Sequence, residues 1–238
     1  MAALTRLVEL DRGQILIDGI NNMTVGLTKL CSNIAIVPQD PVLFSGSSRT
    51  NIDPFNQHFK DRLTDVLSHV GLYSPNDNSS AIKSLDNNVE KDGSNYLSSQ
   101  SQLLVIACAL LGNAVVVICD KATALIDSKA NARIYTKGFC TDFVGSTTLT
   151  VTHRLNTIMD STHILVMADG KVAEFDTPGA LLSKGGLFKD LVDTWEEGHK
   201  CFVQDIPNLF HCGNYHAFKI VHNFGVALFD IFNSYYAD

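Results

Sequence analysis

The sequence predicts an α/β fold with a mainly parallel core sheet, and three observations support this. Short apolar runs alternate with segments of helical periodicity through most of the chain, which is typical of parallel strands joined by helices. The run Val115–Cys119 is continuously apolar, as expected for a strand buried on both faces. In HILVMADGKVAEF (163–175), Asp169-Gly170 joins two apolar runs, which predicts an antiparallel hairpin.

The elements follow in order along the chain. Residues 1–10 resemble the C-terminal end of an amphipathic helix, 13–19 and 33–37 read as strands, and 61–72 as a helix ending near Gly71. A helical subdomain is expected around residues 58–105, with a polar surface loop over 73–95. A buried helix over 99–112, the strand 115–119, a helix from 127, a strand ending at His153, the hairpin and two short helices over 179–195 complete the pattern.

Composition limits the classes of function. The chain has 238 residues, 45% hydrophobic and 18% charged, with a net charge of −7, which suits a globular core. No Lys/Arg cluster marks a nucleic-acid binder. The six cysteines form no C-x-x-C pair and are expected to be reduced thiols of a cytosolic protein. No signal peptide and no apolar run of about 18 residues is seen, so a membrane would be reached through a partner.

Residues 196–238 differ in character from residues 1–195. They are rich in aromatic residues and histidine without a clear period, so they are expected to form a separate, disordered tail. Several metal-ligating side chains lie close together in and just before it, but their spacing matches no zinc pattern: His199, Cys201, His211, Cys212 and His216.

Four motifs occur in a fixed order. IVPQDP contains Gln39, YLSSQ precedes an apolar helix, VVVICD ends in Asp120, and TLTVTHR contains His153. As an ordered set they resemble the nucleotide-binding domain of ATP-binding-cassette (ABC) transporters. The surrounding sequence, such as ILIDGI and EFDTPGALL, is similar to the second such domain of the multidrug-resistance-associated, or C, subfamily. The resemblance covers about residues 1–195.

The resemblance implies a role for each motif. Asp120 would be the Walker B aspartate that orients Mg²⁺, and Gln39 the Q-loop glutamine that touches the metal and relays to the membrane domain. His153 would contact the γ-phosphate of ATP, and Asp127 would face the opposite cassette. Each residue also has a purely structural interpretation: a helix-capping aspartate, a polar loop residue, a structural histidine and an N-cap, respectively.

The sequence departs from the family at the phosphate-binding loop. The motif G-x-x-x-x-G-K-[ST], which cradles phosphates with backbone N–H groups, occurs nowhere in the chain. Met1 aligns inside the helix that follows this loop in the family. We therefore expect a cassette truncated before the P-loop, which also lacks the P-loop strand and leaves an unpaired edge in the core sheet.

The signature motif and the catalytic base also differ. The family signature L-S-G-G-Q aligns with Tyr96 to Gln100, so that Leu97 replaces its serine and Ser99 its second glycine, while Ser98 and Gln100 keep polar character. A one-residue shift would align LSSQ instead, but it moves Gln100 and the following helix out of register. Lys121 stands at the position of the catalytic glutamate, and a protonated lysine cannot accept a proton from water.

The resemblance thus implies an ATP-dependent transport domain, with ATP and Mg²⁺ as cofactors of doubtful binding here. Its partners would be a transmembrane domain and a second cassette, at the cytoplasmic face of a membrane. We expect the chain itself to be inactive. Two alternatives stay open: a non-catalytic module that binds a transporter or a partner cassette, and an ATPase completed by a separate P-loop chain.

Overall fold

The computed structural model describes residues 2–74, 81–120, 143, 145–152, 159, 161–198 and 216–222. The chain divides into two compact units. One unit combines Met1–Ile34 with Thr147–Asp238, and the other is Ala35–Ser146. We call them the outer-segment unit and the middle unit, and each is described by itself.

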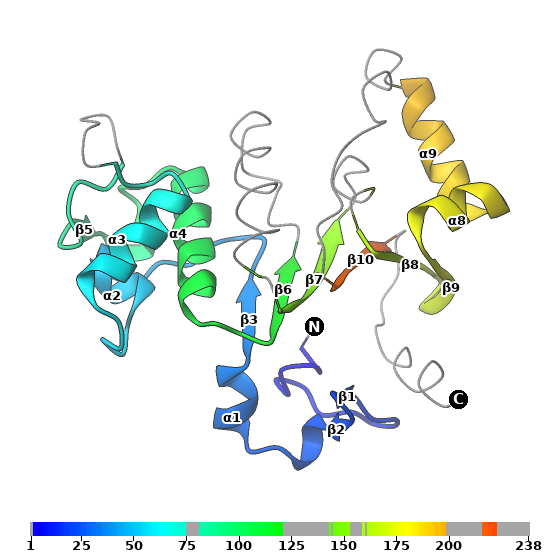
Figure 1. The fold of residues 1–238 in the computed structure, drawn as a ribbon, viewed down its shortest axis with the longest axis horizontal. Helices are drawn as coiled ribbons and strands as arrows, with labels where there is room; N and C mark the ends of the chain where they lie inside the picture. Colours follow the sequence, from blue (N-terminus) through cyan, green and yellow to red (C-terminus); the bar gives the residue numbers. More distant parts are fainter. Residues whose placement is uncertain are drawn as a thin grey trace. The chain divides into compact units, whose positions relative to one another are not determined.

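Two neighbouring strands form the sheet part of the middle unit. Strand β3 (Ile34–Val37) lies beside β6 (Val116–Asp120), and Figure 1 shows both arrows pointing the same way. Val117, Ile118 and Cys119 are almost completely buried, which confirms the buried strand expected from the apolar run. Strand β3 ends before Pro38, which has no backbone N–H for a sheet hydrogen bond.

Helices form the rest of the middle unit, as expected for the predicted helical subdomain. They are α2 (Ser48–Ile52), α3 (Lys60–His69) and α4 (Ser98–Leu111), and α4 contacts both α2 and α3. Strands β4 (Gly46–Ser47) and β5 (Asn88–Val89) pair antiparallel beside them, and a 3₁₀ turn, η2, covers Lys91–Gly93. Part of the loop predicted over 73–95 is therefore ordered structure, and residues 75–80 lie outside the described residues.

The sheet of the outer-segment unit has four strands. Its order is β7 (Thr147–Thr152), β10 (His216–His222), β8 (His163–Ala168) and β9 (Lys171–Asp176). Strands β8 and β9 form the predicted antiparallel hairpin. Asp169 and Gly170 at its turn have φ values of 49° and 73°, which is the conformation that a two-residue type I′ turn requires.

Two helices pack on this sheet. They are α8 (Pro178–Lys184) and α9 (Leu187–Gly198), so the short helix, glycine break and second helix read from the sequence are present. Leu181 of α8 and Phe188 of α9 form a buried cluster with Ile164 and Val166 of β8.

Strand β10 comes from the segment that the sequence suggested to be a disordered tail. It pairs in parallel with β7 on one side and with β8 on the other. The edge that we expected to be unpaired therefore has a partner between these two strands. The boundary near residue 196 stays a prediction, because residues 199–215 and 223–238 lie outside the described residues.

The N-terminal residues form the end of a helix without its body. The amide of Leu7 donates to the carbonyl of Ala2 at 2.9 Å, and that of Arg6 to Ala3 at 3.2 Å. Arg6 has a φ of 57°, so this is the Schellman arrangement that closes a helix. The helical end predicted over residues 1–10 thus stops at Arg6, because a left-handed residue cannot continue the helix.

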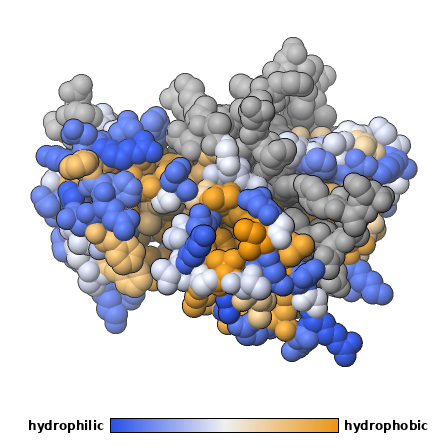
Figure 2. Space-filling view, turned by 60° about the horizontal axis from the view of Figure 1, so that its bottom comes forward, coloured by the Kyte–Doolittle hydropathy of each residue, from blue (hydrophilic) through white to orange (hydrophobic). Residues whose placement is uncertain are grey.

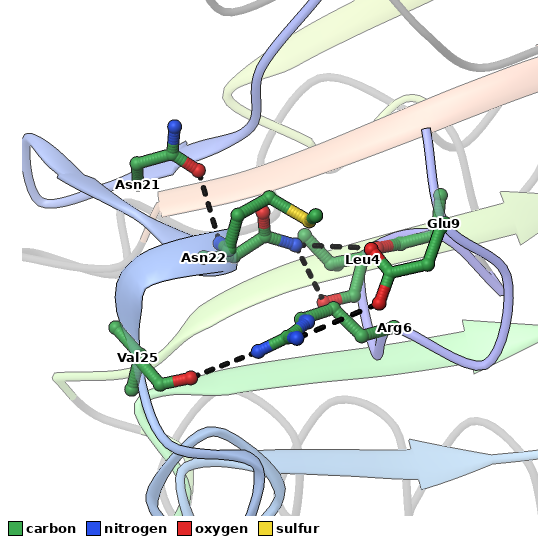
Figure 3. A network of polar contacts seen from close by, with 8 residues as sticks. Leu4, Arg6, Glu9, Asn21, Asn22 and Val25 are labelled. Atoms are coloured by element: carbon green, nitrogen blue, oxygen red, sulfur yellow. Dashed lines mark hydrogen bonds and ion pairs between the residues drawn. The ribbon is translucent and has the colours of Figure 1, made fainter. Parts of the chain in front are cut away.

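A buried asparagine holds this turn on the segment that follows. That segment contains β1 (Leu16–Ile17), β2 (Ile20–Asn21), the 3₁₀ turn η1 (Asn22–Thr24) and α1 (Leu27–Ser32). The side chain of Asn22 donates to the carbonyls of Ala3 and Leu4, and the guanidinium of Arg6 donates to the carbonyl of Val25 at 2.9 Å (Figure 3). Figure 2 shows apolar surface on the face that carries this region, where these large side chains are exposed: Leu7, Val8, Ile20, Met23 and Leu27.

Candidate functional site

Two residues of the predicted metal site lie at the same edge of the middle unit's sheet. Asp120 is the last residue of β6 and is half-buried, while Gln39 follows β3 by two residues and is exposed. Because β3 and β6 are neighbours and run in the same direction (Figure 1), their carboxyl ends share one edge. The local reason is sequence order: each apolar strand is followed at once by its polar residue.

A buried glutamine joins the turn before Gln39 to helix α4. The side chain of Gln102 is fully buried, and its amide nitrogen donates to the carbonyl of Pro38 at 3.1 Å. Its amide oxygen has no hydrogen-bond partner in the described part of the chain. This bond fixes the backbone next to Gln39 against α4. Sequence reasoning missed Gln102, although a glutamine inside the apolar run of this helix was a visible signal.

Helix α4 begins directly after the altered signature position. Leu97 is the N-cap and is 67% exposed, Ser98 is exposed, and Ser99 and Gln100 are half-buried. A leucine has no side-chain acceptor for the free amides of the first helical turn. Instead, the side chain of Gln100 accepts a hydrogen bond from the amide of Leu97 at 3.0 Å. Gln100 therefore acts as a local cap, and the position where the family has serine presents an apolar side chain.

The segment that leads into α4 is held by polar contacts. The side chain of Asn95 accepts from the amide of Glu90 at 3.0 Å and donates to the carbonyl of Asn88 at 2.8 Å. The hydroxyl of Tyr96 lies 3.0 Å from that of Ser48, the first residue of α2. The start of α4 is thus connected to both α2 and β5 of the same unit.

A second polar cluster orders the connection between α2 and α3. The carboxylate of Asp53 accepts from the amides of Gln57 at 2.9 Å and His58 at 2.8 Å. Burial raises the pKa of Asp53, but these two amides and the adjacent His58 ring lower it further, so the net pKa is below the ordinary value. The ordered connection presents Phe55 and Phe59, which are 80% and 89% exposed.

Other predicted residues lie outside the described residues. Lys121, Asp127 and His153 belong to this group, as do the tail residues His199, Cys201, His211 and Cys212. Within the described ranges, no group of three or more His, Cys, Asp or Glu side chains is placed to hold a metal ion. Across the same ranges, no helix has the length and apolar content to cross a membrane.

The residues in place fit Mg²⁺-ATP only in part. The carboxylate of Asp120 and the amide oxygen of Gln39 are hard oxygen donors, which Mg²⁺ prefers. Phosphates require a set of N–H donors or a lysine, and the sequence contains no glycine-rich loop with its lysine. At the start of α4, the amide of Leu97 already donates to Gln100. Because this set does not complete a site for the nucleotide, we derive no chemical step through it.

Comparisons with known proteins were made for sequence and fold. Residues 1–124 match the family model described as ABC transporter. The chain is 45% identical over 193 residues to ABC transporter C family member 3 of Dictyostelium discoideum, which covers 80% of this chain and 13% of that protein. It is 42% identical over 187 residues to ATP-binding cassette sub-family C member 3 of Rattus norvegicus, covering 78% of this chain and 12% of that protein.

A solved structure is similar in fold. It is the structure of a bacterial Atm1-family ABC exporter with ATP bound, with a TM-score of 0.73 and 27% sequence identity. The match covers 82% of this chain and 34% of that chain. The chain therefore spans only a small part of the proteins that it resembles.

Proposed function

Since the chain belongs to the ABC transporter family and corresponds to the ATP-binding domain of a C-subfamily exporter, we propose that it keeps the scaffold of this domain without its ATPase activity. Residues 1–195 would be the cassette part and residues 196–238 a segment of different origin. The family binds ATP and Mg²⁺ in general. For this chain we propose ATP binding weaker than about 1 mM, because phosphate contacts in such domains come mainly from the loop that the sequence lacks.

The start of α4 is the observation that carries the proposal of inactivity. Leu97 is exposed there, and its amide is occupied by Gln100. An apolar side chain cannot donate to the phosphate of a partner cassette, and Ser99 adds a side chain where the family has glycine. Lys121 after the metal-binding carboxylate is the second change, since it removes the general base, which typically contributes 10²–10⁴-fold in rate.

Several residues would keep their family roles if Mg²⁺-ATP were supplied with its missing loop. Asp120 and Gln39 would hold the metal, His153 would meet the γ-phosphate, and Asp127 with the Ser98–Gln100 segment would face a second cassette. Their common support is the motif order and, for Gln39 and Asp120, their position at one sheet edge.

A second function, binding to a transporter without catalysis, is favoured by the surface of the middle unit. Phe44, Phe55 and Phe59 are 74%, 80% and 89% exposed. Phe44 is held in place by Asn51 of α2, which bonds both its amide and its carbonyl at 2.8 Å. Ordered, exposed aromatic residues are typical of protein contacts. The partner would be the membrane domain of a transporter, which would bring the chain to the cytoplasmic face of a membrane.

Phosphate release with Mg²⁺-ATP tests the first proposal. The full chain and an Asp120→Asn variant should release phosphate at the same background rate, and calorimetry should detect no tight nucleotide binding. Turnover by the full chain that Asp120→Asn abolishes would show that the domain is an ATPase and would end the proposal.

A further inference from the structure

The chain passes from β7 to β8 without pairing these strands with each other. Strand β10 lies between them (Figure 1). It is parallel to β7 over six paired positions, from His216 opposite Thr147 to Val221 opposite Thr152. On its other side it is parallel to β8, from Phe218 opposite His163 to His222 opposite Met167.

The neighbouring strands have the burial of central strands. Four consecutive residues of β8, from Ile164 to Met167, are at most 3% exposed, and Thr148 and Thr150 of β7 are buried as well. Strands covered on both faces are typical of the middle of a parallel sheet. Without a strand between them, β7 and β8 would each leave a row of backbone N–H and C=O groups unpaired in this buried setting, which is costly.

We propose that β7 and β8 form an acceptor site for one extended, parallel strand, and that residues 216–222 of the same chain are its occupant. The recognition is mainly through backbone hydrogen bonds, which an extended segment of suitable composition can supply. The sequence of the segment, HAFKIVH, suits this role, because four of its seven residues are apolar and it contains neither glycine nor proline. The C-terminal segment is thus a structural component of the cassette sheet. This inference is independent of ATP binding.

The first test removes one backbone donor from the strand in the full-length chain. Lys219→Pro deletes an N–H in the middle of β10, where proline is not tolerated between two partners. Lys60→Pro is the matched control: Lys60 is exposed at the first position of α3, and Phe59 before it has the extended conformation (φ −72°, ψ 155°) that proline requires.

Hydrogen–deuterium exchange is the measurement. Lys219→Pro should accelerate exchange of amides in β7 and β8 at least about fivefold, the change expected from one lost backbone hydrogen bond. The middle unit should be unaffected, and Lys60→Pro should leave β7 and β8 unchanged. Equal exchange in Lys219→Pro and the unsubstituted chain would overturn the inference.

A crosslink covers the case in which the proline variant does not fold. Thr150 and Lys219 are direct partners in the register, so Thr150→Cys with Lys219→Cys should form a disulfide within one chain under mild oxidation. Thr150→Cys with His222→Cys, displaced by three residues or roughly 10 Å, should not. Peptide mapping of the monomer and dimer bands gives the answer. A bond found only in dimers, or equal yields from both pairs, would reject the assignment of residues 216–222 to their own chain's sheet.

Discussion

Glu174 of β9 caps the N-terminus of helix α9, and its removal is expected to loosen that helix selectively. Its carboxylate accepts hydrogen bonds from the amides of Leu187 at 2.9 Å and Phe188 at 3.0 Å. These amides have no partner inside the helix, and a negative charge at this end is also favoured by the helix dipole. Phe188 itself is fully buried in the cluster with β8.

The magnitude follows from the two bonds. A hydrogen bond to a charged group contributes about 1.5–3 kcal/mol. One of the two amides lies in an exposed setting, so we expect Glu174→Ala to lower the free energy of unfolding by about 2–4 kcal/mol. Glu174→Gln keeps one acceptor oxygen and should cost roughly half as much. Glu9→Ala is the control, since Glu9 makes one exposed contact of 3.5 Å with Arg6 and should cost less than about 1 kcal/mol.

The chain offers a suitable reporter for this experiment. Trp195 is its single tryptophan and belongs to α9, so urea unfolding followed by tryptophan fluorescence reports on this helix. A Glu174→Ala variant within about 0.5 kcal/mol of the unsubstituted chain, or a loss no larger than that of Glu9→Ala, would refute the capping role.

A double-mutant cycle makes the reasoning sharper. A Cβ added at Gly186 would lie 2.1 Å from a carboxylate oxygen of Glu174, so Gly186→Ala must displace the capping group. Gly186→Ala should therefore destabilise the unsubstituted chain clearly more than it destabilises Glu174→Ala, since the displaced group is already gone. Equal effects in the two backgrounds would contradict the proposed geometry.

Three further predictions concern other parts of the chain. The lowered pKa of Asp53 means that its contribution is present above pH ~4 and is lost as the pH falls through its folded-state value. Asp53→Asn should thus lower the free energy of unfolding by about 1–3 kcal/mol at pH 7, and urea titrations should show this difference shrinking toward pH 2; a constant difference would contradict the sign. Burial raises the pKa of the Cys108 thiol, whereas Cys31 is exposed, so alkylation followed by mass spectrometry should modify Cys31 at least about tenfold faster than Cys108 in the folded chain; comparable rates would show that α4 opens readily. Lys121→Glu alone should not start phosphate release, because catalytic groups act as a unit; hydrolysis by this single variant would mean that the phosphate site is already complete.

Local sequence signals were sufficient for several elements. The Asp169-Gly170 turn predicted the β8–β9 hairpin, and the apolar run before Asp120 predicted a buried strand with a carboxylate at its end. In both cases the information lies within a few consecutive residues, because turn conformation and burial on both faces each leave a short pattern.

The remaining features depend on contacts between distant residues. Gln102 bonds to Pro38, 64 positions away, and Glu174 reaches the amides of a helix that begins 13 residues later. Neither partner is visible in a local window. The strand role of residues 216–222 was missed for the same reason, since a central strand is defined by two neighbours and its own sequence has no clear period.

The position of β10 between β7 and β8 also sets an order of events during synthesis. Strand β8 ends at Ala168 and β10 begins at His216, so 47 intervening residues must be translated before the central strand is available. At the usual rate of about 5–20 residues per second, this is a delay of roughly 2–10 s, long compared with the microsecond times of hairpin formation. The β8–β9 hairpin will therefore exist before its sheet does, and in that interval the nascent chain exposes two strand edges to chaperones and to other nascent chains.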